Sequence, residues 1–382
     1  MNIKGESIMI ERTIKKRIKS SFCKGKAVII YGARQVGKTT LINDIMEEDL
    51  MTGLYLNCDE PDIRDSLTNV TSTKLKEMFG NKKIIFIDEA QRVKNIGLTL
   101  KIIVDTFKDL QVVATGSSAL ELSNEIMEPL TGRAFEFRLY PFSVEELSAK
   151  YSDLEFMRIL ENRMIFGNYP DIINFPDEAE KRLGMIANNY LYKDLLQYQN
   201  IKKSDVLEKL VRLLALQIGS EVSFNELASV LGVAKQTVEH YVKLLEQCFI
   251  VFRLTPFSRN LRSELTKKCK IYFYDTGVRN SLIKNFNPLD LRTDSGALWE
   301  NYIISERIKK NSNHDRDFNI YFWRTLQQHE IDYIEEKNGK ISGYEIKYKK
   351  DGFKIPSPFT QAYPKSPVDL INRDNFREFV TD

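Results

Sequence analysis

The feature that most constrains this chain is the segment Gly32-Ala33-Arg34-Gln35-Val36-Gly37-Lys38-Thr39, which matches G-x-x-x-x-G-K-[ST] at every fixed position. The run 27–31 before it is apolar, and a helical pattern begins at Thr40 after it. Glycines let the backbone wrap closely around phosphates, while successive N–H groups and the helix N-terminus face the anion. The alternative is a chance match in an ordinary strand-turn-helix. The pattern predicts nucleotide contacts from Gly32 to Thr40, in which Lys38 reaches the β- and γ-phosphates and Thr39 ligates Mg²⁺.

A second apolar run, residues 84–87, ends in the acidic pair Asp88-Glu89. Such runs are typical of strands buried on both faces of a parallel sheet. In enzymes with a phosphate-binding loop, an aspartate at this place holds Mg²⁺, and a following glutamate can orient and deprotonate the attacking water. We assign the first role to Asp88 and the second to Glu89; the alternative is the solvated end of a strand. Residues 110–115 predict another buried strand, and hydroxyls at Ser117 or Ser118 can sense the γ-phosphate or the water.

Composition limits the remaining possibilities. With 382 residues the chain exceeds what one hydrophobic core usually supports, so we expect two or three domains. The net charge of +3 is small, so a nucleic-acid surface would have to be a local patch. The 4 cysteines are scattered and there are 3 histidines, which argues against a zinc site or a disulfide framework. Because neither a membrane span nor the apolar core of a signal peptide is visible, we expect a cytoplasmic protein with no membrane partner.

The N-terminal residues through Lys26 predict a helix rich in basic side chains. A solvated helix face is favoured over DNA contact as the interpretation of this charge. The basic residues are Arg12, Lys15, Lys16, Arg17 and Lys19.

The middle of the chain is helical in pattern. Residues 143–199 fit a helical lid that packs on a nucleotide-binding core. Three shorter helical patterns follow between Leu207 and Gln247. Because Ser223 is placed to cap the second and Gly232 to turn the chain into the third, this region has the form of a helix-turn-helix.

Two strand-like runs, 249–254 and 271–274, flank a basic loop that includes Arg259 and Lys270, as expected for the wing of a winged helix. Winged helices also bind proteins, so the fold alone leaves the partner open. The basic loop favours nucleic acid. We expect contacts to DNA phosphates from Lys235, Arg262, Lys267 and Lys268.

A hairpin is predicted near the C-terminus. Strand-like runs at 330–334 and 343–348 are separated by Asn338-Gly339, the strongest short hairpin signal. The expected register pairs Lys337 with Lys340.

This register places charged residues on one face of the hairpin. Asp332 lies opposite Glu345, and Glu330 lies opposite Lys347. Directly opposed carboxylates repel one another, so the arrangement is plausible where a divalent cation binds between them.

With these motifs in place, the sequence resembles the AAA+-like ATPases, and specifically a bacterial and archaeal family that joins such an ATPase to a C-terminal domain called DUF4143. The resemblance is carried by YGARQVGKTTL at 31–41, IIFIDEAQ at 84–91, ATGSSA at 114–119 and LTGRAFEFRLYPFSVEEL at 130–147. It implies an ATP-driven homo-oligomer in which Ser117 or Ser118 is the sensor. It also makes Arg133 the candidate arginine finger, with a plain surface arginine as an equal alternative. Residues 88–91 are also similar to a helicase box, but no second set of helicase motifs follows.

The C-terminal hairpin is similar to the PD-(D/E)xK nuclease fold, with isoleucine in place of the usual proline before Asp332. This resemblance implies that Glu300, on a preceding helix, joins Asp332 and Glu345 in binding Mg²⁺ or Mn²⁺. Lys347 would then position the attacking water.

The predicted fold class is α/β. It combines an AAA+-like P-loop parallel sheet at 1–142, a helical lid at 143–200, a winged helix at 201–287 and a restriction-endonuclease-like α/β domain at 288–382. The expected function is Mg²⁺-dependent ATP hydrolysis coupled to DNA binding and, as a further step, to DNA cleavage. The alternative is a nucleotide-switched oligomeric scaffold whose nuclease-like domain only binds.

Overall fold

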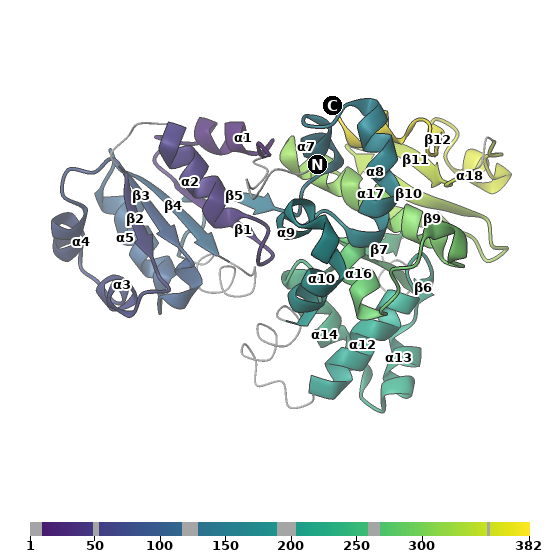
Figure 1. Cartoon of the computed structure of the whole chain (residues 1–382), viewed down its shortest axis with the longest axis horizontal. Coiled ribbons are helices and arrows are strands. Elements are labelled where there is room, and N and C mark those ends of the chain that lie inside the picture. The colour runs from purple at the N-terminus through teal and green to yellow at the C-terminus, as the bar shows by residue number, and fades with distance from the viewer. Residues whose placement is uncertain (1–9, 49–52, 117–128, 189–203, 259–267, 350–351) are drawn as a thin grey trace. The chain divides into compact units, whose positions relative to one another are not determined.

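The structure is a computed structural model that describes residues 10–48, 53–116, 129–188, 204–258, 268–349 and 352–382 (Figure 1). The chain divides into two compact units. The N-terminal unit comprises Glu11–Pro141 with Gln247–Phe249, and the C-terminal unit comprises Phe142–Glu246 and Ile250–Asp382 together with Ile10. None of the helices in the described ranges is long and apolar enough to cross a membrane.

The N-terminal unit is a five-stranded parallel sheet accompanied by short helices (Figure 1). Its elements are α1 (Lys15–Ser20), β1 (Ala27–Gly32), α2 (Lys38–Glu48), β2 (Leu54–Asn57), α3 (Pro61–Leu67), α4 (Ser72–Phe79), β3 (Ile84–Asp88), η1 (Ala90–Arg92), α5 (Ile96–Thr106), β4 (Gln111–Gly116) and β5 (Ala134–Leu139). The strand order is β2-β3-β4-β1-β5, and every pairing is parallel. Because β1, β3 and β4 are mostly apolar, they are buried along their whole length. Their carboxyl ends meet at one edge, where ligands bind in open α/β sheets.

The basic N-terminal segment differs from its prediction. In the described residues the helix expected through Lys26 is confined to α1. The interpretation of a solvated basic face is wrong for Arg12 and Lys15, which are 6% and 3% exposed. The Lys15 ammonium pairs with Asp44 at 2.7 Å, so this charge stabilises the packing of α1 on α2.

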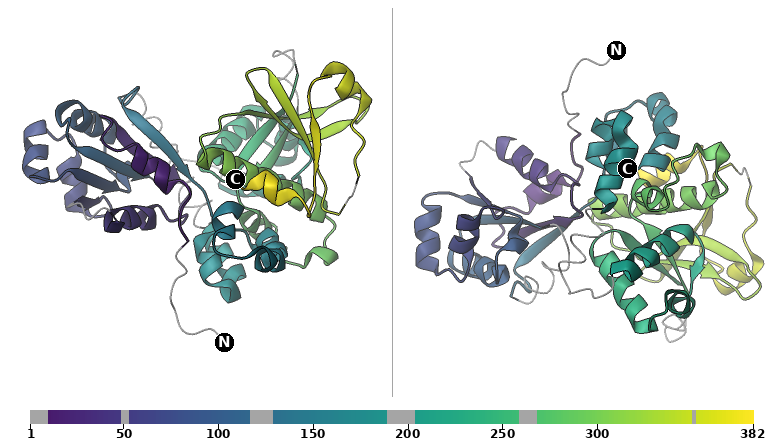
Figure 2. Two further views of the ribbon diagram at one scale, coloured as in Figure 1. Left: turned by 90° about the horizontal axis from the view of Figure 1, so that it is seen from above. Right: turned by 60° about the horizontal axis from the view of Figure 1, so that its bottom comes forward.

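The C-terminal unit contains two helical groups and a second sheet (Figure 1). Its elements are α7 (Val144–Ser148), α8 (Asp153–Phe166), α9 (Pro170–Asn174), η2 (Pro176–Glu178), α10 (Ala179–Asn188), α12 (Ser204–Leu216), β6 (Glu221–Val222), α13 (Phe224–Leu231), α14 (Lys235–Gln247), β7 (Val251–Pro256), β8 (Cys269–Phe273), α16 (Thr276–Leu282), η4 (Leu289–Leu291), α17 (Ser295–Asn313), β9 (Asn319–Arg324), β10 (Glu330–Lys337), β11 (Lys340–Ile346), α18 (Ser357–Ala362), β12 (Val368–Ile371) and α19 (Phe376–Val380). Helix α17 packs against β8, β11 and α19. Figure 2 shows the yellow C-terminal helix α19 beside the green α17.

Helices α12 to α14 form the predicted helix-turn-helix. The Ser223 hydroxyl caps α13 by accepting from the backbone N–H of Glu226, and Gly232 ends α13 with a φ of 64°. Strand β8 pairs antiparallel with both β6 and β7, which completes a winged helix. Lys270, expected in the exposed basic loop, instead lies on β8 and is 1% exposed.

The second sheet joins the winged helix to the C-terminal strands. Its order is β12-β11-β10-β9-β7-β8-β6, and the junction is the parallel pair of β7 with β9. The predicted hairpin register is confirmed, because Lys337 pairs with Lys340 and Tyr333 with Tyr344. The predicted fold class is likewise confirmed, with a parallel core sheet and a second mixed sheet. The division into four domains stays a prediction.

A buried polar network connects α17 to the beginning of the C-terminal unit. The Glu306 carboxylate accepts from the backbone N–H of Val144 at 2.6 Å and from Nδ2 of Asn168 at 3.1 Å. The Lys309 ammonium donates to Glu306 at 2.7 Å and to the carbonyl oxygen of Phe142 at 3.3 Å. These contacts fix the first residues of the unit on α17.

Candidate functional site

The phosphate-binding loop connects the end of β1 to the start of α2. Gln35 and Gly37 have φ values of 59° and 94°, so the backbone turns tightly between strand and helix. Gly32 is needed at the end of β1 because a Cβ there would lie 2.0 Å from the carbonyl oxygen of Leu139 on β5. The sequence therefore forms the loop where the motif predicts it.

Lys38 is buried at the start of α2. Its ammonium donates to the carbonyl oxygens of Gly32 at 3.0 Å and Ala33 at 2.8 Å. These bonds fold the side chain back over the loop, where the motif expects phosphate.

Arg12 is a contact of this loop that the sequence interpretation missed. One of its guanidinium nitrogens donates to the carbonyl oxygen of Tyr140 at 3.1 Å, and another donates to that of Val36. Arg12 therefore ties the loop to the segment after β5. Within a run of basic residues, nothing in the sequence marked it as different from its neighbours.

Asp88 lies at the end of β3 and is 2% exposed. Its Oδ2 accepts from the hydroxyls of Thr39 and Tyr55, each at 2.7 Å. Its Oδ1 accepts from the Thr115 hydroxyl and from the backbone N–H of Glu89, the latter at 3.1 Å. The carboxylate is thus held on both oxygens by neutral donors.

This donor set fits Mg²⁺. The Thr39 hydroxyl and the Asp88 carboxylate are in contact, and both are the hard oxygen ligands that Mg²⁺ prefers. Because the partners of Asp88 are uncharged, its negative charge stays available to a cation.

Glu89 follows Asp88 in a left-handed backbone conformation with a φ of 51°. This turn separates its side chain from the strand, and the backbone N–H donates to Thr115 Oγ1 at 3.2 Å. The carboxylate accepts a hydrogen bond from Gln91. Glu89 is half-buried beside Asp88, where the sequence placed the base for the attacking water.

Tyr55 and Thr115 are further site residues that the sequence interpretation missed. Burial and the hydrogen bond to Asp88 raise the pKa of Tyr55 above its usual value, so its hydroxyl remains a donor. The predicted sensor, Ser117, lies outside the described residues, as does Ser118. Thr115 could have been found from its hydroxyl at the carboxyl end of β4.

Arg133 precedes β5 and lies away from the phosphate-binding loop. The pairing of Ala27 with Ala134 places it beside the first residue of β1, whereas the loop follows the last. Its Nε donates to Asp105 at 2.9 Å, and both side chains are about 40% exposed. Within the N-terminal unit, Arg133 therefore lies at the amino ends of the strands, and Lys38 lies at their carboxyl ends.

The predicted C-terminal residues also come together. We call Glu300, Glu330, Asp332 and Glu345, with Lys270 and Lys347, the acid–lysine cluster. The Lys347 ammonium lies 3.3 Å from Asp332 and 2.9 Å from Glu345. Burial alone lowers the pKa of Lys347, but these carboxylates raise it to about 12. Burial and the nearby Asp332 raise the pKa of Glu345.

Two side chains on β8 donate hydrogen bonds to Glu300. Its Oε1 accepts from the Lys270 ammonium at 3.0 Å and from the Tyr272 hydroxyl at 2.5 Å. Burial raises the pKa of Glu300 to about 7, although Lys270 acts in the opposite direction. In the described part of the chain, no group of three or more His, Cys, Asp or Glu side chains is arranged to hold a metal ion. Metal binding by Glu300, Asp332 and Glu345 therefore stays a prediction from the resemblance.

Two of the four residues predicted to contact DNA lie in the part of the chain that the structure describes. Lys235, at the start of α14, is about half exposed and pairs with Glu239 at 3.0 Å. Lys268 is exposed immediately before β8. Arg262 and Lys267 lie outside the described residues.

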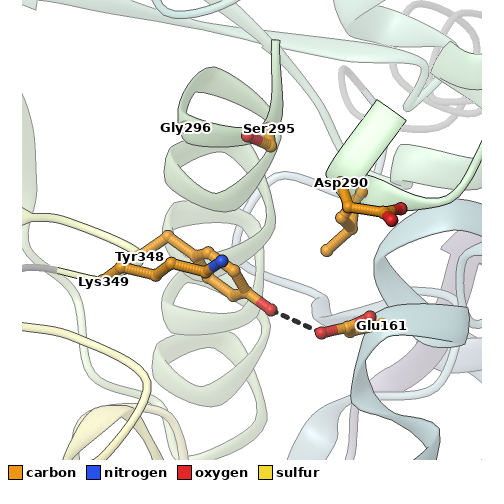
Figure 3. A pocket seen from close by; sticks show the side chains of 7 residues that line it. Glu161, Asp290, Ser295, Gly296, Tyr348 and Lys349 are labelled. Carbon is orange, nitrogen blue, oxygen red and sulfur yellow. Dashed lines mark hydrogen bonds between the residues drawn. The ribbon is translucent and has the colours of Figure 1, made fainter. Parts of the chain in front are cut away.

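A polar pocket of about 270 Å³ lies elsewhere in the C-terminal unit (Figure 3). It is lined by Glu161, Leu289, Asp290, Ser295, Gly296, Tyr348 and Lys349. The Tyr348 hydroxyl donates to Glu161 at 2.8 Å across it. None of the predicted site residues lines this pocket, and we assign it no function.

Comparison with protein families supports the motif assignments. Residues 24–148 match a family described as AAA domain. Residues 157–289 match a domain of unknown function, DUF8612, and residues 295–369 match DUF4143. The chain thus matches both an AAA domain and DUF4143, the two domains that the resemblance implied. The winged helix falls within the DUF8612 match and outside the DUF4143 match.

Similar proteins and structures are found over much of the chain. An uncharacterised protein of Mycobacterium tuberculosis is 27% identical over 342 residues, covering 87% of this chain and 72% of the relative. An uncharacterised protein of Methanocaldococcus jannaschii is 25% identical over 357 residues, covering 83% of this chain and 72% of the relative. Among solved structures, the Thermotoga maritima RuvB Holliday junction branch migration motor has a TM-score of 0.30 at 19% identity, covering 68% of this chain and 95% of that one.

Tyr55→Phe tests the hydrogen bond to Asp88. Because one donor to Oδ2 is lost, we expect the Mg²⁺-dependent part of nucleotide affinity to fall roughly fivefold, while affinity without Mg²⁺ is unchanged. A fluorescent ATP analogue titrated at several Mg²⁺ concentrations measures both. Tyr31→Phe is the matched control, since its hydroxyl bonds to Glu136 on β5. Equal Mg²⁺ dependence in wild type and Tyr55→Phe would contradict this role.

Proposed function

We propose that this protein is a Mg²⁺-dependent ATPase. The observation that carries the proposal is the contact of the Thr39 hydroxyl with Asp88 at 2.7 Å, beside the buried ammonium of Lys38. The two oxygen ligands proposed for Mg²⁺, from Thr39 and Asp88, thus lie at the same end of the sheet as the Lys38 ammonium, which would bind phosphate. When bound, Mg²⁺ would neutralise charge on the phosphate oxygens.

Each residue then has one role. Lys38 and the N–H groups of the loop bind the phosphates, and Thr39 with Asp88 hold the cation. Tyr55 and Thr115 orient the Asp88 carboxylate. Glu89 accepts a proton from the attacking water, and Ser117 completes the site as sensor.

Glu89→Gln and Lys38→Ala separate hydrolysis from binding. Glu89→Gln removes the base but keeps the phosphate contacts, so ATP binding is expected to persist while hydrolysis slows at least about 100-fold. Lys38→Ala is expected to lose ATP affinity itself. Phosphate release and equilibrium ATP binding are the two measurements, and Glu77→Gln, an exposed glutamate on α4, is the control. Wild-type turnover by Glu89→Gln would exclude it as the base.

We further propose that the protein works as a homo-oligomer with Arg133 acting on a neighbouring subunit. Arg133 lies at the sheet edge opposite its own phosphate-binding loop, which supports a role in trans rather than in cis. Its exposure and its exchangeable pair with Asp105 leave it accessible to a partner.

Arg133→Ala is expected to bind ATP but to lose hydrolysis by on the order of 10³-fold. Mixed with Glu89→Gln, it is expected to regain part of the activity, because some interfaces then combine an intact arginine with an intact base. Steady-state ATPase activity across mixing ratios measures this, with Arg158→Ala, an exposed arginine on α8, as control. Full activity in a strictly monomeric protein would rule out the role in trans.

We propose DNA as the partner whose binding is coupled to nucleotide state. The helix-turn-helix and the exposed Lys235 and Lys268 support this choice. A winged helix that binds another protein is the competing possibility.

Replacing Lys235, Arg262, Lys267 and Lys268 by alanine tests the partner. If all four contact phosphates, DNA affinity falls for every sequence and the salt slope flattens by roughly 3 to 4. Fluorescence anisotropy over a range of salt concentrations measures both. The matched control removes the same charge from exposed residues elsewhere, namely Lys74, Lys76, Arg158 and Lys181. Unchanged affinity and slope would indicate a protein partner.

For the nuclease-like domain, DNA cleavage with Mg²⁺ or Mn²⁺ is one candidate and DNA binding without chemistry is the other. The position of Lys270 among the acids favours the second. We therefore propose a nucleotide-switched protein whose nuclease-like domain is a binding module.

A further inference from the structure

The acid–lysine cluster contains a positive charge that the nuclease resemblance does not include. Lys270 is 1% exposed, and its ammonium lies 3.0 Å from Glu300 Oε1 and 3.9 Å from Asp332 Oδ1. It also forms an ion pair with Glu330. The ammonium therefore lies among carboxylates that the resemblance assigns to a divalent cation.

The predicted metal ligands already have partners of their own. Asp332 Oδ2 accepts from the backbone N–H of Ile346 at 2.9 Å and pairs with Lys347. Glu300 Oε1 is shared by Lys270 and Tyr272. In the described residues, Glu345 Oε2 and Glu330 Oε1 are buried without a hydrogen-bond partner. Glu330 Oε1 is nevertheless ion-paired with Lys270, so Glu345 Oε2 is left, and one oxygen does not make a ligand set.

The position of Lys270 is fixed by several contacts. Asn301, next to Glu300 on α17, accepts from the backbone N–H of Phe273 at 2.9 Å and donates to its carbonyl oxygen at 2.7 Å. This clamp sets α17 against β8. Lys270 and Tyr272 lie two residues apart on β8, so both face Glu300. Burial would favour a neutral lysine, but the surrounding carboxylates raise the pKa of Lys270 well above its usual value.

A divalent cation at these oxygens would lie beside a buried ammonium of the same sign. Little water is present to screen that repulsion, because Lys270, Glu300 and Asp332 are all buried. The residues present therefore do not fit the metal that the fold resemblance implies.

We propose that Lys270 is the built-in cation of the acid–lysine cluster, so that this nuclease-like centre is held together by an ammonium and binds no divalent metal. The inference deepens the proposed binding role of the domain. It does not depend on ATP hydrolysis or on DNA affinity.

The test measures thermal stability with Mn²⁺ as the probe, in the full chain without nucleotide. The Mn²⁺-dependent change in Tm is expected to be the same in wild type, Asp332→Asn and Glu345→Gln. Lys270→Met leaves the buried carboxylates uncompensated, so its Tm is expected to fall. Mn²⁺ is then expected to raise the Tm of this variant by about 3 °C or more, and Asp332→Asn in the same chain should abolish the rescue.

Lys309→Met is the matched control. Lys309 is equally buried in the same unit, but among the described residues its ion-pair partner is Glu306. Its loss is expected to lower the Tm without rescue by Mn²⁺. Metal bound at Thr39 and Asp88 contributes equally to all these variants and cancels in the comparison.

Two results would overturn the inference. One is a Mn²⁺-dependent stabilisation of wild type that requires Asp332 or Glu345, and the other is a folded Lys270→Met protein that Mn²⁺ does not rescue. If Lys270→Met does not fold at all, Mn²⁺ binding to wild type and Glu345→Gln, followed by electron paramagnetic resonance, decides. Equal binding by the two supports the built-in cation, and a loss of binding in Glu345→Gln refutes it. The ATPase and DNA-binding proposals stand or fall on other measurements.

Discussion

A buried charge must be compensated, and the way in which this is done distinguishes the two candidate sites. Asp88 is compensated by hydroxyls and a backbone N–H, which stabilise the carboxylate without cancelling its charge. Glu300 is compensated by the ammonium of Lys270, which does cancel charge. The first arrangement still attracts a cation, whereas the second already contains one.

The N-terminal site could be predicted from the sequence because its determinants are local. The phosphate-binding loop, β2 and the end of β3 all lie where apolar runs and motif spacing place them. Parallel pairing then brings Thr39 and Asp88 together, although they are distant in sequence. Tyr55 was missed because a tyrosine in an apolar strand usually packs in the core.

The C-terminal site could be predicted only in part. The turn at Asn338-Gly339 fixes the register of β10 and β11, and this gave the pairing of the hairpin correctly. Lys270 could not be placed, because its burial depends on the contact of β8 with α17, which the hairpin does not encode. A lysine in a basic stretch is normally solvated, and only long-range packing overrides that expectation. The same reason explains why Arg12 and Lys15 were expected to be exposed.

The division into four domains stays a prediction, and within the C-terminal unit α17 contacts residues far from it in sequence. Glu306 and Lys309 hold the first residues of the C-terminal unit, while Glu300, on the same helix, contacts β8. The winged helix shares its strands with the C-terminal sheet through β7 and β9.

The continuity of this sheet has a mechanical consequence for the proposed function. Lys268, a proposed phosphate contact, precedes Lys270 by two residues, and Lys270 binds the acids of the cluster. A displacement of the wing at Lys268 would move β8, and the two hydrogen bonds of Asn301 to the backbone of Phe273 hold β8 on α17. Because α17 also holds Phe142 and Val144, the wing and the segment that follows the N-terminal unit are linked through one helix. The acid–lysine cluster is part of the same packing, since Lys270 and Glu300 join β8 to α17.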